Sequence, residues 1–279
     1  GSREIVYGLH VGRDRGQMMM RICGGLRVEK IIERDGLGSA PAEYRYTYEG
    51  GVVYAERFDY VQRIYHQSQY SESYSLSSHC LNAITDNNGS PVIYSTVSKY
   101  FPDGSCIKYE YEPLEEFDDL YPEKYLVEQD SVKFLGYERE ENLPKTVQAW
   151  GRNLLKKKSL YDSDGKVVKS TEFQYIIDTV HAVRIAGLIP YRSQVDGHRV
   201  SCLARYFHIC CPVLPKTRIE YAGKASLYCR TDYLYNRHHL PSHEIKRYAD
   251  GTRVTSYTKY RCDLPDKIYI GSVKQRAPY

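Results

Sequence analysis

Apolar and polar positions alternate along most of this chain with a period of two residues. Tyr, Val, Ile and Thr fill many of the apolar positions, and aromatic and β-branched residues are typical of strands. Tyrosines fall on every second position, and so share one face of a strand, in three sets: Tyr44, Tyr46 and Tyr48; Tyr109 and Tyr111; Tyr233 and Tyr235. The alternation predicts an all-β protein.

A hairpin unit recurs along the chain, consisting of one strand, a turn with a glycine, and a Tyr-rich return strand. Three copies start at Leu154, Leu214 and Leu240, and the last two starts are 26 residues apart. Further copies lie at 92–111 and, in degenerate form, at 26–48. Asp-Gly supplies the positive φ that tight hairpins need. We therefore expect an antiparallel meander of repeated β-hairpins forming a strongly twisted sheet, a sandwich or an open barrel-like coil.

Helical periodicity is almost absent. The best candidate, residues 114–120, is short and acidic and lies between Pro113 and Pro122, which indicates a loop with at most one helical turn. The acidic loop 113–124 and the Ser/Tyr-rich stretch 68–78 interrupt the series of hairpins. We interpret residues 1–279 as a single β domain with weak internal boundaries near 70 and 115.

The composition suggests broad, wet sheet surfaces in place of a thick core. The chain has 29 Tyr against 6 Phe and one Trp, and a buried tyrosine hydroxyl needs a hydrogen-bond partner. The net charge of +4 comes from 39 basic and 35 acidic residues, which argues against nucleic-acid binding. The basic run 156–158 is interpreted as a solvated strand edge. No apolar stretch approaches the length of a membrane span.

The eight cysteines contain no Cys-x-x-Cys pair, so zinc ribbons and thioredoxin-like chemistry are not expected. Whether they form disulfides stays open. Cys210 and Cys211 near His208 suggest a thiol nucleophile, but their apolar neighbours favour a buried structural strand.

Three stretches carry metal-binding residue types, and each has a simpler explanation. His239 and His243 are four residues apart, but Pro241 between them prevents the helix that would place both on one face, and we expect them to face solvent. The acidic loop lacks the spacing of a calcium loop, and 86–89 is explained as an Asn-Gly turn. We expect no metal site and no cofactor.

Enzymatic motifs are missing as well. The sequence contains no Gly-x-Ser-x-Gly elbow, no phosphate-binding glycine loop and no His-Glu-x-x-His, and no pair of carboxylates stands out. We therefore expect no enzymatic activity. Aromatic rows on a sheet can stack on sugars or peptides. The candidate ligand-binding residues are Trp150, Tyr109, Tyr111, Tyr233 and Tyr235, although Trp150 can also be explained as part of a core.

The units 161–175 and 248–260 resemble the YD repeats of bacterial RHS/YD-repeat proteins. Such proteins are large and secreted or surface-displayed, and their hairpins coil into a shell around a toxin domain or form adhesive stalks. The resemblance implies a non-enzymatic extracellular or cell-surface module that serves as scaffold, shell segment or adhesin, with a protein or glycan partner. The alternative is a carbohydrate-binding or carbohydrate-processing surface protein. We expect the chain, which opens without a signal-peptide pattern, to be a piece or mature form of a longer protein.

Overall fold

The protein is almost entirely β. Its computed structural model describes residues 2–13, 20–53, 61–66, 71–76, 92–112, 117, 119–128, 131–137, 143–195, 198–223, 226–260 and 263. These residues contain no α-helix, and their one short 3-10 helix is η2 (Ala149–Gly151). The all-β class predicted from the alternation is confirmed. Within the described part, no helix has the length and apolar character to cross a membrane.

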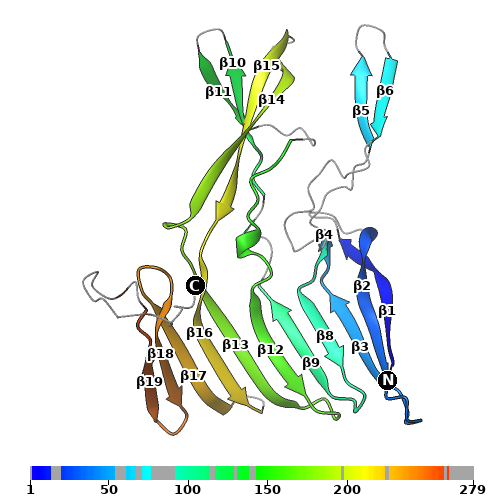
Figure 1. Cartoon of the computed structure of the whole chain (residues 1–279), viewed down its shortest axis with the longest axis vertical. Helices are drawn as coiled ribbons and strands as arrows, with labels where there is room; N and C mark the ends of the chain where they lie inside the picture. The colour runs from blue at the N-terminus through cyan, green and yellow to red at the C-terminus, as the bar shows by residue number, and fades with distance from the viewer. Residues whose placement is uncertain are drawn as a thin grey trace, which may run out of the picture.

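Thirteen strands form one large sheet in the order β19-β18-β17-β16-β13-β12-β9-β8-β3-β2-β1-β4-β7 (Figure 1). They are β1 (Ser2–Arg13), β2 (Met20–Arg34), β3 (Ala42–Glu49), β4 (Val52–Val53), β7 (Val92–Ile93), β8 (Thr96–Tyr100), β9 (Cys106–Tyr111), β12 (Leu155–Tyr161), β13 (Val167–Ile177), β16 (Val213–Ala222), β17 (Ser226–Tyr235), β18 (Pro241–Tyr248) and β19 (Arg253–Tyr257). Neighbours pair antiparallel except β1 and β4. The sheet is open, with β19 and β7 as its edges, so it is a meander of hairpins and not a closed barrel.

Two smaller sheets arise where the chain leaves the large one. The first has the order β11-β10-β15-β14 and consists of β10 (Glu123–Val127), β11 (Val132–Tyr137), β14 (Val183–Val195) and β15 (His198–Cys210). The second pairs β5 (Val61–His66) with β6 (Ser71–Leu76). Figure 1 shows β14 and β15 extending beyond the end of β13. The boundaries expected near 70 and 115 lie outside the described residues.

The basic run 156–158 does not lie on an edge, contrary to the expectation. It belongs to β12, which pairs with β9 on one side and β13 on the other. Lys157 Nζ lies 2.9 Å from Glu172 Oε1 on β13, and Lys158 Nζ lies 5.6 Å from the centroid of the Tyr109 ring. The expectation was wrong because alternation shows which residues share a face, whereas the number of neighbours of a strand depends on the whole topology.

Four hairpin turns share one hydrogen-bond pattern. In each turn the first N–H donates to the carbonyl four residues later, and the fourth N–H donates back to the first carbonyl; the turns are 101–105, 162–166, 236–240 and 248–252. The fourth residue has positive φ, with values of 85° at Gly104, 75° at Gly165, 60° at His239 and 86° at Gly251. This is a three-residue hairpin loop with a left-handed residue at its end. Asp-Gly marks three of these turns, and histidine stands in the glycine position of the fourth.

Gly251→Ala is expected to lower the free energy of unfolding by about 1–2 kcal/mol, the penalty of left-handed backbone for an L-residue. Nothing lies within 4 Å of a Cβ built at this position, so the loss comes from the backbone and not from a clash. Urea unfolding measures it. Gly251→Asn is the matched control and should recover part of the loss, because asparagine tolerates positive φ. Equal stability of Gly251→Ala and the parent would contradict the turn assignment.

A tyrosine hydroxyl closes four of the hairpins. In each, a tyrosine on or just after the second strand donates to a backbone carbonyl of the first strand: Tyr48 to Val28 at 2.7 Å, Tyr175 to Leu155 at 3.0 Å, Tyr235 to Pro215 at 2.5 Å and Tyr260 to Pro241 at 3.1 Å. The first three pairs are each separated by 20 residues. We call these four contacts the tyrosine latches. They give the hydroxyls of four half-buried tyrosines a hydrogen-bond partner.

The hydrophobic core is small. A cluster of Val53, Val92 and Tyr94, with Tyr48 and Val97 packed against it, lies where β3, β4, β7 and β8 meet. Many large apolar side chains elsewhere are exposed, including those of Ile22 and Leu26 on β2. The broad, wet sheet surfaces suggested by the composition are therefore present in the described strands. Ladder hydrogen bonds, turns and cross-strand side-chain pairs hold most of the large sheet together.

Candidate functional site

The structure does not bring the predicted tyrosines together. Tyr109 and Tyr111 lie on β9, Tyr233 and Tyr235 lie on β17, and all four side chains are half-buried. Strands β12, β13 and β16 separate β9 from β17, so four strand spacings put the two pairs about 19 Å apart. The Tyr235 hydroxyl is also engaged in its latch.

Trp150 occupies a third location. It lies in η2, and its half-buried ring packs edge-on against Phe117 with the ring centroids 5.1 Å apart. The preceding β-strand is β11 and the following one is β12, so the tryptophan belongs to a connection and not to either tyrosine-bearing strand. The five candidate ligand-binding residues thus occupy three separate regions of the molecule.

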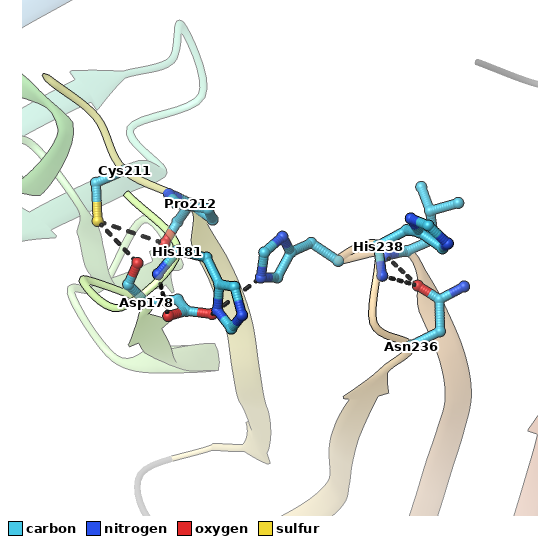
Figure 2. Close-up of polar contacts among 8 residues, drawn as sticks. Asp178, His181, Cys211, Pro212, Asn236 and His238 are labelled. Atoms are coloured by element: carbon cyan, nitrogen blue, oxygen red, sulfur yellow. Dashed lines mark hydrogen bonds and ion pairs between the residues drawn. The ribbon is translucent and has the colours of Figure 1, made fainter. Parts of the chain in front are cut away.

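A different set of residues does converge. Asp178 follows the last residue of β13, His181 lies in the turn before β14, and His239 lies in the turn between β17 and β18. The carboxylate oxygen of Asp178 and one ring nitrogen from each histidine all lie within 4.8 Å of one another. Figure 2 shows Asp178 and His181 facing the turn that begins at Asn236. We call these three residues the Asp-His cluster.

Both imidazoles contact the same carboxylate oxygen. Nδ1 of His181 lies 2.7 Å and Nε2 of His239 lies 2.9 Å from Asp178 Oδ2, and the two rings stand edge to face with centroids 5.3 Å apart. The His181 backbone N–H donates to the other oxygen, Oδ1. The hydrogen bonds from His239 and then His181 lower the pKa of Asp178 to about 2. The carboxylate is therefore charged at neutral pH.

The backbone of Asp178 is held in place from both sides. Its N–H donates to the Pro212 carbonyl at 3.0 Å, and its own carbonyl accepts the Cys211 thiol at 3.4 Å. Burial, followed by the charge of Asp178, raises the pKa of the Cys211 thiol, so this sulfur is not activated as a nucleophile. Cys210 is exposed and Cys211 is buried. Among the described cysteines, Cys106, Cys210, Cys211 and Cys229 form no disulfide.

Sequence reasoning found His239 but not its partners. It considered His239 as a pair with His243, whose ring instead lies 4.7 Å from the Tyr257 ring, centroid to centroid. Asp178 is 61 residues from His239, so only the sheet order reveals their proximity. One signal was available in the sequence, because the turn 236–240 carries histidine where the three similar turns carry glycine. The turn at 86–89 and the acidic residues Glu115, Glu116 and Asp118 lie outside the described residues.

The chain matches no protein-family model, no curated protein and no solved structure.

Proposed function

We propose that this chain is a non-enzymatic repeat module of an extracellular or cell-surface protein of the YD-repeat type, serving as scaffold, shell segment or adhesin. In this proposal the large sheet is the binding surface. It is built from successive hairpins, and its faces contact a protein or glycan partner. The repeated closure of hairpins by the tyrosine latches is the observation that carries the proposal. A unit that closes itself in the same way each time can be added in series.

The turns support the same reading. Three of the four similar turns carry Asp-Gly, and each closes through its own backbone hydrogen bonds. A Cβ built at Gly165 or Gly251 would meet nothing within 4 Å, whereas one built at Gly104 would contact Ser163 of the adjacent turn. Asp162 Oδ1 accepts the N–H groups of Asp164 and Lys166, which fixes one turn with its own side chain. Two hairpins, β12–β13 and β18–β19, contain both an Asp-Gly turn of this pattern and a latch. Such modular construction suits an extended surface more than a single catalytic centre.

Removing one latch hydroxyl is expected to lower the free energy of unfolding by about 0.5–1.5 kcal/mol, the net value of one hydrogen bond. The variants are Tyr48→Phe, Tyr175→Phe and Tyr235→Phe, together with the triple variant. Because the three latches close different hairpins, their effects should add in the triple variant. Tyr257→Phe is the control, since Tyr257 is 71% exposed and its loss should stay within about 0.5 kcal/mol. Phenylalanine variants as stable as the control would contradict the repeat-unit proposal.

The binding role needs its own measurement. A glycan panel read through the fluorescence of the single tryptophan, Trp150, tests the carbohydrate-binding alternative. Saturable binding that is lost in Tyr109→Ala or Tyr111→Ala would favour that alternative over the scaffold. Lack of binding across the panel, combined with additive latch effects, supports the scaffold. Protease accessibility of the protein on intact cells of its source tests the surface location, and protection would overturn it.

A further inference from the structure

We propose that Asp178, His181 and His239 bind one divalent transition-metal ion of the zinc class and that this ion ties two hairpin turns together. The inference goes beyond the scaffold function and does not depend on it. It also departs from the sequence-based expectation of no metal site, which considered His239 only together with His243.

The ligand set is the first argument. Two imidazole nitrogens and one carboxylate oxygen form a set that zinc and similar borderline ions accept, whereas calcium and magnesium prefer oxygen ligands alone. The three ligand atoms already lie within 4.8 Å of one another. With three protein ligands, the fourth position of a tetrahedral ion would go to water. The Asp-His cluster therefore offers an open site and not a closed structural one.

The two distances from Asp178 Oδ2 to the histidine nitrogens agree with a small local adjustment. Ligand atoms of a tetrahedral zinc site lie about 3.3 Å from one another, since each is about 2.0 Å from the ion. The ring nitrogens of His181 and His239 now lie 2.7 and 2.9 Å from Asp178 Oδ2. Each contact must widen by about half an ångström to admit the ion. A neutral imidazole can carry its proton on its other nitrogen, which leaves the lone pair of the nearer nitrogen for the metal.

The supports of the cluster are already in place before a metal binds. Asp178 is held through its N–H, its carbonyl and Oδ1 by Pro212, Cys211 and His181. Groups that fix a metal-ligating carboxylate in this way tune and orient the site. The His239 side chain is only 27% exposed, so its ring is not free in solvent. The site thus has two well-anchored ligands, Asp178 and His239, and a more exposed one, His181.

The backbone of His239 is the second, independent argument. Its φ of 60° is left-handed, and the equivalent residues of the three similar turns, Gly104, Gly165 and Gly251, are glycines. A non-glycine residue in this conformation is disfavoured, so the turn would be easier to form with glycine. Backbone strain of this kind concentrates at functional sites. His239 occupies this conformation, and its side chain contacts Asp178, which also contacts His181. We infer that the side chain of His239 is there to bind the metal ion.

The test is zinc titration of the metal-stripped full chain by isothermal calorimetry. The parent should bind one equivalent of Zn²⁺, and unfolding should shift to higher temperature with added zinc. His239→Gly and His181→Ala should each weaken binding by more than about tenfold, the lower end of what supporting residues already contribute. His239→Gly is the more decisive variant. It places at this position the glycine that the three similar turns carry, so the hairpin should stay folded while the imidazole is lost.

Matched controls separate this site from other zinc ligands. His238→Ala and His243→Ala remove neighbouring imidazoles and should leave affinity unchanged. Cys210→Ser removes the exposed thiol of the neighbouring residue, and it too should leave affinity unchanged. The inference is overturned if the parent binds no zinc, which would leave a metal-free ion-pair network, or if His239→Gly binds as tightly as the parent. Loss of binding in Cys210→Ser would likewise reject the three-residue ligand set.

Discussion

Tyr94→Ala is expected to destabilise the N-terminal part of the large sheet by about 3–5 kcal/mol, the usual effect of removing a buried aromatic ring. Tyr94 is 8% exposed and packs with Val53 and Val92 in the small core. Its ring lies 4.8 Å from the Tyr48 ring, centroid to centroid. Since the core is so small, few other side chains can close the cavity. Urea unfolding followed by circular dichroism measures the loss.

The hydroxyl of Tyr94 has a separate contribution. It accepts hydrogen bonds from Arg27 Nη1 at 3.0 Å and from the Val11 N–H at 3.4 Å. Tyr94→Phe keeps the ring and leaves these donors without that acceptor, so we expect a loss of about 1–3 kcal/mol. Tyr7→Ala is the control, because Tyr7 is 52% exposed, and its effect should be much smaller. If Tyr94→Ala and Tyr7→Ala lower stability equally, the cluster is not the core of this region.

Much of the fold follows from local signals in the sequence. The period-two alternation predicted the strands, and Asp103–Gly104, Asp164–Gly165 and Asp250–Gly251 each mark a hairpin turn of the large sheet. Both signals act over a few residues, so they predict strands and turns whatever the arrangement of the rest of the chain. The meander follows from them because consecutive strands joined by tight turns must pair antiparallel.

The long-range features could not be predicted in the same way. The pairing of β13 with β16 spans the whole β14–β15 hairpin, and nothing local marks the return. That pairing also places the β17–β18 turn near the end of β13, and so brings His239 to Asp178. The excess of tyrosine indicated that many hydroxyls need partners, but it did not predict the tyrosine latches. Their 20-residue spacing has meaning only once the strand lengths are known.

The junction between the thirteen-stranded and the four-stranded sheet involves Leu120, at the end of the stretch 114–120 that the sequence predicted as a loop. Leu120 and Thr146 exchange backbone hydrogen bonds at 2.9 and 2.8 Å, and Thr146 Oγ1 accepts the Phe207 N–H of β15 at 2.9 Å. η2 follows directly, before β12 begins. The connection thus contacts the four-stranded sheet and then enters the large one. Its hydrogen bonds add to the chain connections β13–β14 and β15–β16, which also join the two sheets.

Arg152→Ala is expected to loosen this junction and to lower the free energy of unfolding by about 3–5 kcal/mol, the effect of breaking a buried ion pair by removing one partner. The Arg152 side chain is fully buried and pairs through Nη2 with Asp119, which is 16% exposed. Its Nε donates to the Phe117 carbonyl at 2.8 Å. Removing the guanidinium leaves a largely buried carboxylate without its cation and releases the segment that packs against Trp150.

The single tryptophan gives this prediction a local readout. Because Trp150 packs on Phe117, its emission should shift to longer wavelength in Arg152→Ala before the strands unfold, as water reaches the ring. Lys156→Ala is the matched control, since Lys156 pairs with Glu112 while both side chains are well exposed, and it should change stability by at most about 1 kcal/mol. Identical emission and unfolding midpoints for the two variants would show that Arg152 does not hold the junction.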